Sequence, residues 1–260
     1  MSSKNKNTAA DAVRIALPME RVNSPAHIVR TDDEAITIAH DLAGRFAAGA
    51  SSRDRDRRLP KAELNEFSQS GLWGITIPCQ FGGPGLSFAT AAEVATIVSK
   101  ADSCLGQIPQ NHYYMIEALR LDGTDQQKEY FFSKVLEGDR FGNAFVELGT
   151  KTVFDFETRL TNKNGELVLN GRKFYCTGAL FAHWVPVVAK NDEDRVIIAF
   201  VSRDAPGLTI LDDWSSFGQR TTASGTAVFE NVVVLPNNVI DHQAAFDLSL
   251  IHISEPTRRT

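Results

Sequence analysis

An aromatic side chain and a hydroxyl side chain stand two residues apart near the middle of the chain. They are Tyr175 and Thr177, in the run Phe-Tyr-Cys-Thr-Gly at residues 174–178. An aromatic ring can stack on a flat heteroaromatic ligand, and a neighbouring hydroxyl can donate a hydrogen bond to the ligand's edge. These residue types suit a site for a planar cofactor. The alternative is an ordinary β-hairpin without a ligand.

Two Asn-Gly pairs indicate how the aromatic run is held. Asn164-Gly165 predicts a two-residue type I′ turn, because both central residues of that turn need positive φ. The apolar stretch 167–169 then lies in an expected strand over 166–169. Asn170-Gly171 predicts a second turn before the aromatic run.

The period of the apolar residues changes near residue 139. Residues 31–138 have apolar residues three and four apart, with capping signals at Thr31-x-x-Glu34 and Thr124-x-x-Gln127, and predict about five helices. One of these helices is expected to break or kink at Pro109. Residues 139–247 contain short runs typical of strands. The expected strands are 141–146, 156–162, 166–169, 174–177, 184–189, 196–202, 207–211 and 226–234.

This segregation predicts an α+β protein, in which an all-helical N-terminal domain is followed by an antiparallel β-barrel or sandwich. Residues 1–30 have no sustained period and are expected to form an irregular arm. The last stretch, 248–260, resembles a translated sequencing adapter and is expected to be a non-native tail; the alternative is a genuine frayed terminus.

Composition excludes several classes of function. The net charge of −5 offers no basic surface for nucleic acid or an anionic membrane. Cys79, Cys104 and Cys176 are too widely spaced for a zinc site or a disulfide framework. No apolar stretch reaches the length of a membrane span. We therefore expect a cytoplasmic protein without a metal.

Three motifs, in order, resemble the acyl-CoA dehydrogenase superfamily. Residues 169–178, Leu-Asn-Gly-Arg-Lys-Phe-Tyr-Cys-Thr-Gly, resemble its central hairpin, and residues 74–86 resemble its glycine-rich loop between early helices. Residues 218–226 and 228–232 resemble its later β-domain signature. The resemblance covers about residues 30–245. It implies a flavin lying between the β domain and a C-terminal helical bundle, and that bundle is expected to be missing from this chain.

The resemblance implies roles for particular residues. Tyr175 and Thr177 match the positions beside the isoalloxazine ring, where the hydroxyl lies near flavin N5. Phe145 and Val146 match the strand whose backbone reaches the pyrimidine edge, and Asn143 matches a position near the reactive face.

Further residues are implied with alternatives left open. Arg220 and Ser224 are expected to contact the flavin phosphate, or else to form a structural turn. His112 is the candidate proton donor or substrate-orienting group from the helical domain, since a histidine takes either protonation state near neutral pH. Its alternative is a packed core residue.

One departure from the family pattern indicates a branch. Acyl-CoA dehydrogenases usually have T-E-P-x-A-G-S-D where this chain has Glu147 followed by Leu-Gly-Thr-Lys-Thr-Val, in which Lys151 and Thr152 remain candidates for a phosphate contact. The Cys-Thr-Gly hairpin end, Asn143 and residues 219–225 resemble instead the branch of dibenzothiophene monooxygenase-like and sulfur-acquisition oxidoreductases.

That branch implies a homotetrameric, reduced-FMN-dependent monooxygenase, supplied by a separate flavin reductase. It would oxygenate a small organosulfur compound with O2 through a C4a-hydroperoxyflavin, whose survival depends on hydrogen bonds near N5 and on excluding water. Asn143 and Thr177 are the expected donors. The alternatives are an FAD-dependent acyl-CoA dehydrogenase and an inactive truncated fragment.

Overall fold

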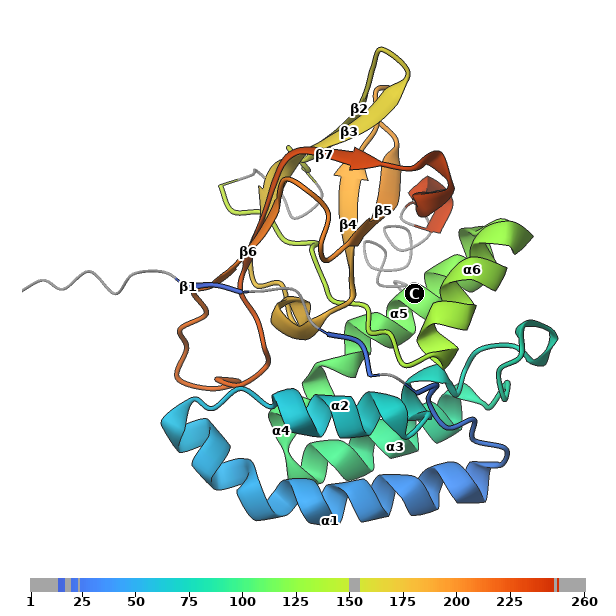
Figure 1. Ribbon diagram of the computed structural model, residues 1–260, viewed down its shortest axis with the longest axis vertical. Helices are drawn as coiled ribbons and strands as arrows, with labels where there is room; N and C mark the ends of the chain where they lie inside the picture. The colour runs from blue at the N-terminus through green and yellow to red at the C-terminus, as the bar shows by residue number, and fades with distance from the viewer. Residues whose placement is uncertain (1–13, 17–19, 23, 150–154, 246, 248–260) are drawn as a thin grey trace, which may run out of the picture.

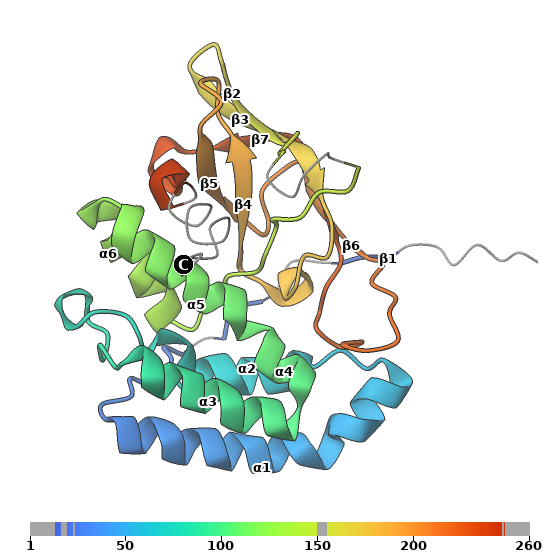
Figure 2. The ribbon, with the colours of Figure 1, turned by 180° about the vertical axis from the view of Figure 1, so that it is seen from behind.

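The computed structural model describes residues 14–16, 20–22, 24–149, 155–245 and 247. Helices occupy one half of the molecule and a curled sheet occupies the other (Figures 1 and 2). The predicted fold class, an α+β protein with helices before strands, is confirmed. The helices are α1 (Asp32–Asp56), α2 (Lys61–Gln69), α3 (Phe88–Ala101), α4 (Ser103–Gln107), α5 (Pro109–Asp122) and α6 (Asp125–Leu136).

Helix starts follow the capping residues. The Thr31 hydroxyl accepts the Glu34 amide at 3.1 Å at the start of α1. At the start of α6, Thr124 and Gln127 form a complete capping box, with 3.3 Å and 2.8 Å bonds in the two directions. Such caps satisfy amides that the first helical turn leaves unpaired. The break expected at Pro109 is present, because α4 ends at Gln107 and α5 begins at the proline.

Aromatic residues of α6 join the helical half to the sheet. Phe131 lies 4.5 Å from Phe200 between ring centroids, and Phe200 lies 5.5 Å from Phe141. All three rings are buried. Each such side chain contributes about 1.5 to 3 kcal/mol by leaving water. This cluster fixes α6 against β5, so the segment that starts at Phe141 has a rigid support.

The sheet contains eight described strands in the order β1-β6-β7-β3-β2-β4-β5-β8. It is antiparallel except for the β2–β4 pair, which is parallel through Arg159 and Lys190, so the sheet is mixed rather than purely antiparallel. The strands are β1 (Arg14–Ile15), β2 (Arg159–Lys163), β3 (Glu166–Lys173), β4 (Trp184–Lys190), β5 (Val196–Ser202), β6 (Leu208–Asp212), β7 (Thr226–Val234) and β8 (Val239–Asp241).

The first Asn-Gly pair turns the chain as predicted, but the second does not. Asn164 and Gly165 have φ of 56° and 93°, as a type I′ turn requires. The second expected turn is wrong: β3 continues to Lys173, with a bulge between Leu169 and Gly171. A Cβ on Gly171 would lie 2.3 Å from the Thr158 hydroxyl, so the glycine there serves close packing between strands.

Other segments also differ from the sequence-based expectation, including the expected strand 174–177, where only Phe174 forms a bridge. The expected strand 141–146 forms only isolated bridges, at Phe141, Ala144 and Val146, because it passes from a parallel contact with β4 to an antiparallel contact with Phe174. The arm expected to be irregular contributes β1, which pairs with β6 at the sheet edge.

Candidate functional site

The aromatic run is fastened to the loop before β7. The Cys176 amide donates to the Gly225 carbonyl at 2.8 Å, and the Gly178 amide donates to the Thr222 carbonyl at 3.0 Å. Between these anchors and β3, Tyr175 takes a left-handed φ of 56°, a conformation uncommon for a residue with a Cβ. Its side chain is 48% exposed and meets Trp214 edge-on at 5.5 Å. The fold thus exposes the Tyr175 ring to solvent while its backbone keeps a conformation that is unfavourable for a residue with a Cβ.

A chain of hydroxyls leads from the loop interior to Thr177. Thr222 and Ser224 are buried and share a 2.8 Å hydrogen bond, and Ser224 donates to the Thr177 hydroxyl at 3.4 Å. Thr177 itself donates only over 3.5 Å to the Tyr175 carbonyl, which is at the limit for a hydrogen bond. The half-buried Thr177 hydroxyl therefore has a proton to offer to a ligand.

A shallow hollow of about 170 Å³ opens beside Tyr175, with Phe174, Trp214 and Thr226 among its lining residues. Pockets for small ligands usually measure about 300 to 1,000 Å³. Alone, the hollow can support one face or edge of a flavin-sized ring but cannot enclose it.

The strand at Phe145 and Val146 is held by a buried ion pair. Lys173, with no exposed surface, donates to the Phe145 carbonyl at 3.1 Å and pairs with Glu147 at 2.6 Å. Phe174 donates its amide to the Val146 carbonyl at 2.8 Å. The predicted pyrimidine-edge strand is thereby placed against the start of the aromatic run. Sequence reasoning assigned no such partner to Lys173.

Burial and hydrogen bonding act in opposite directions on this pair. Burial lowers the pKa of Lys173 below its ordinary value, although Glu147 opposes the change. Burial also tends to raise the pKa of Glu147. Hydrogen bonds from Lys173, and from the Thr158 and Glu157 amides at 3.1 Å and 2.7 Å, outweigh burial, so the pKa of Glu147 lies below its ordinary value. The carboxylate is kept ionised as a fixed acceptor.

The side-chain oxygen of Asn143 is a hydrogen-bond acceptor without a partner in the described part of the chain. This amide oxygen is buried. A buried polar atom without a partner costs about 1 to 3 kcal/mol, so it is normally explained by a missing water, ion or ligand. Asn143, expected as a donor, therefore presents an unpartnered acceptor, whereas Thr177 presents a weakly held donor.

A proton-donor role for His112 does not fit the geometry. The residue is fully buried; its Nδ1 accepts the Phe141 amide at 3.0 Å, and its Nε2 lies 3.0 Å from the Trp73 carbonyl. Burial lowers the pKa of His112 to about 3. Both ring nitrogens are therefore engaged in a neutral ring, and the packed-core alternative describes His112.

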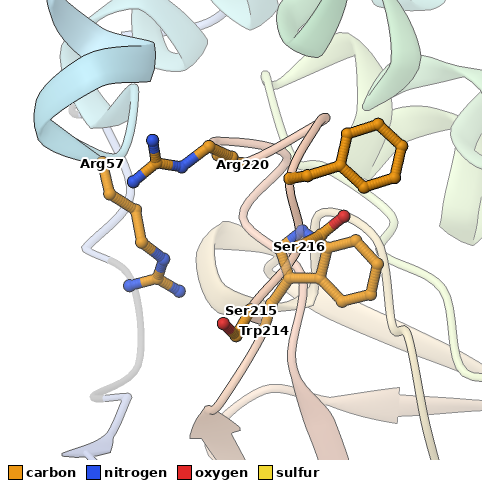
Figure 3. A pocket seen from close by; sticks show the side chains of 6 residues that line it. Arg57, Trp214, Ser215, Ser216 and Arg220 are labelled. Atoms are coloured by element: carbon orange, nitrogen blue, oxygen red, sulfur yellow. The ribbon is translucent and has the colours of Figure 1, made fainter.

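Arg220 and Ser224, expected to meet a phosphate together, occupy different settings. Ser224 belongs to the buried hydroxyl chain, whereas Arg220 lines a separate hollow of about 130 Å³ beside Arg57 (Figure 3). Arg57 is paired with Asp212 at 2.5 Å. Lys151 and Thr152, the other phosphate candidates, lie outside the described residues.

Some classes of site are absent from the part of the chain that the structure describes. No group of three or more histidine, cysteine or acidic side chains there could hold a metal ion. No helix among those residues combines the length and apolar character needed to cross a membrane.

A helical domain followed by a β domain with a polar, open hairpin end is the arrangement of flavin-binding acyl-CoA dehydrogenase-like proteins. Comparison with family models agrees: the acyl-CoA dehydrogenase N-terminal domain matches residues 37–139, and the middle domain of the same family matches residues 149–232. The chain belongs to the acyl-CoA dehydrogenase superfamily.

Individual relatives are similar over most of this chain. A dibenzothiophene monooxygenase of Rhodococcus erythropolis is 32% identical over 227 residues, which cover 85% of this chain and 54% of that protein. A Pseudomonas putida protein named "Probable FMNH2-dependent monooxygenase SfnC" is 32% identical over 79% of this chain and 51% of its own length.

A solved structure supports the same placement. FMN-bound TdsC from Paenibacillus sp. A11-2 superposes with a TM-score of 0.76 at 29% identity, over 83% of this chain and 56% of that chain. The present chain thus spans about half the length of the relatives it matches.

Proposed function

We propose that this chain is the flavin-facing part of a reduced-FMN-dependent monooxygenase that acts on a small organosulfur compound. The observation that carries the proposal is the hairpin end itself, where the exposed Tyr175 ring lies beside the Thr177 hydroxyl, whose own proton is held only by a 3.5 Å contact. The unpartnered oxygen of Asn143 supports it. The names of the relatives support FMN and an organosulfur substrate.

Each residue has a distinct task in this proposal. Tyr175 presents its ring for stacking, Thr177 donates a hydrogen bond to the ring edge, and Asn143 accepts one. Lys173 and Glu147 keep the Phe145–Val146 backbone at the other edge. Bound reduced flavin would supply two electrons to O2, so that one oxygen atom enters the substrate and the other leaves as water.

The proposal includes partners and a compartment. Reduced FMN would come from a separate flavin reductase, as the FMNH2-dependent name of one relative suggests. The whole protein would be a homotetramer in the cytoplasm. The shallow hollow fits this arrangement, since a ring held on one face here needs other surfaces to complete its site.

Flavin titration tests the proposal. The chain is titrated with FMN and FAD, oxidised and dithionite-reduced, by fluorescence and calorimetry. We expect tighter binding of FMN, and Tyr175→Ala should weaken it about tenfold, because loss of a stacking ring costs roughly 1 kcal/mol or more. Thr177→Val should weaken it about fivefold through one lost hydrogen bond. Tyr130→Ala is the matched control, because Tyr130 is similarly exposed on α6.

The product formed during turnover distinguishes a monooxygenase from an acyl-CoA dehydrogenase. With a flavin reductase, NADH and O2, mass spectrometry should detect the sulfoxide of dibenzothiophene. Preference for FAD, together with bleaching of that FAD by butyryl-CoA, would instead assign the protein to the dehydrogenases. If Tyr175→Ala bound FMN as tightly as the unchanged chain, the hairpin end would not hold the ring.

A further inference from the structure

Three titratable side chains outside the proposed site form a continuous hydrogen-bonded line. Asp122 Oδ2 lies 2.6 Å from His242 Nδ1, and His242 Nε2 lies 2.6 Å from the Tyr114 hydroxyl. Asp122 and Tyr114 belong to α5, whereas His242 directly follows β8. Both distances are short, as expected when an ionised group takes part. No sequence motif marks Asp122 or His242.

The line has a buried middle residue and one exposed end. His242 is buried, but Tyr114 is 43% exposed. The Tyr114 ring meets Phe145 edge-on, with 5.8 Å between centroids. The open end therefore borders the strand whose backbone is proposed to reach the flavin. His112 lies only two residues from Tyr114 on α5, but both of its ring nitrogens are buried and hydrogen-bonded in the core.

We propose that Asp122, His242 and Tyr114 form a proton relay, whose Tyr114 hydroxyl delivers a proton to an oxygen atom of a ligand bound beside Phe145. This inference rests on the proposed monooxygenase function, in which one oxygen atom of O2 must become water. Tyr114 is the residue that touches the ligand; Asp122 and His242 are positioning residues.

The relay has two states that differ by one proton. When His242 is neutral, Nδ1–H donates to Asp122, and Nε2 accepts the Tyr114 hydroxyl proton. When His242 is protonated, Nε2–H donates to the Tyr114 oxygen, so the phenolic proton is free to point at a ligand. Delivery breaks the Tyr114 O–H bond toward the ligand oxygen as the Nε2 proton moves to Tyr114. The phenol is restored, and His242 is left neutral.

The surrounding charges favour this arrangement. Burial, aided by Asp122, raises the pKa of Tyr114, so the residue stays a phenol near neutral pH and passes protons without accumulating as phenolate. Arg195, directly before β5, and Asp241, the last residue of β8, are engaged with each other at 2.6 Å. Within the described part of the chain, Asp122 is the only charged side chain bonded to the imidazole.

Nuclear magnetic resonance on the chain as it stands tests the relay. The ¹⁵N signals of His242 and the ¹³Cζ signal of Tyr114 are followed from pH 4 to 9 without flavin. We expect one shared midpoint, with Tyr114 remaining a phenol throughout. Asp122→Asn should change the His242 and Tyr114 signals together, because Nδ1 loses its carboxylate partner.

Two variants make the test specific. Tyr114→Phe keeps the ring on Phe145 and should change the His242 Nε2 signal. Tyr113→Phe is the matched control: its hydroxyl bonds the Leu72 carbonyl at 2.8 Å and should leave His242 unchanged. Separate midpoints for His242 and Tyr114, or an Asp122→Asn variant in which only one of them moves, would overturn the relay. Because no flavin is present, such a failure is distinguishable from failure of FMN binding.

Discussion

Removing Lys173 tests whether the buried ion pair holds the β domain together. Lys173→Met keeps most of the side-chain length and removes the ammonium group that reaches Glu147 at 2.6 Å and the Phe145 carbonyl at 3.1 Å. It also removes the cation 4.5 Å above the Phe156 ring. Glu147, only 6% exposed, is left as a buried carboxylate without a cation.

The magnitude follows from that uncompensated charge. Breaking a buried pair by removing one partner costs about 3 to 5 kcal/mol. Glu147 retains the amides of Glu157 and Thr158 as donors, so we expect the lower end, about 3 kcal/mol. Adding Glu147→Gln removes the unpaired charge but keeps an acceptor for only one of the two amides, because Glu157 and Thr158 bond different carboxylate oxygens. The double variant should therefore regain about 1 to 2 kcal/mol relative to Lys173→Met.

Urea unfolding followed by tryptophan fluorescence, at pH 7 and fixed salt, measures these differences. Lys134→Met is the matched surface control, because Lys134 pairs with Glu137 at 2.7 Å on an exposed helix face and should cost less than about 1 kcal/mol. The reasoning fails if Lys173→Met costs no more than this control, or if Glu147→Gln restores nothing.

The same pair gives a pH dependence with a defined sign. The pKa of Glu147 lies below its ordinary 4.5 in the folded protein. The stabilisation that Glu147 provides is therefore present above pH 4.5 and is lost as the pH falls through the folded value. In Lys173→Met this acid-side loss should begin at higher pH, because the main partner of the carboxylate is gone.

Three further predictions concern other buried groups. Burial lowers the pKa of His112 to about 3, so the free energy of unfolding should fall as the pH drops from 6.5 toward 3. One proton taken up on unfolding corresponds to a slope of roughly 1.4 kcal/mol per pH unit. Urea unfolding of His112→Gln should show a pH dependence that is smaller by this amount. Gly225→Ala should destabilise the chain by more than about 2 kcal/mol in the same assay, because a Cβ there would lie 1.9 Å from a backbone oxygen, whereas Gly218→Ala in open space should cost little. A thiol reagent at pH 8 should label exposed Cys79 and spare Cys176, because burial raises the pKa of Cys176 to about 12.

Local sequence signals predicted the elements where a single strong rule applied. The Thr124 capping box, the break at Pro109 and the Asn164-Gly165 turn each depend on residues within a few positions of one another. The bounds of β5 and β7 also came directly from apolar runs. The turn expected at Asn170-Gly171 failed because Thr158, on another strand, decides what that glycine does.

The site was only partly predictable for the same reason. Motif resemblance selected Tyr175 and Thr177, but the hydroxyl chain behind Thr177 joins loops far apart in the sequence. His112 looked available because a lone histidine gives no sign of its partners. Conversely, the residues next to His242 in the sequence give no sign of its role, because its hydrogen-bond partners lie on α5, about 120 residues earlier.

The pairing of β1 with β6 has a consequence for how the chain is made. Arg14 meets Asp212 across about 200 residues, so at roughly 5 to 20 residues per second a ribosome needs on the order of 10 to 40 seconds between them. The helices of residues 32–136 make mostly local contacts and can form during that interval. β1 and β3 both pair with strands made later, β6 and β7, so the β domain can close only after most of the described chain has been synthesised.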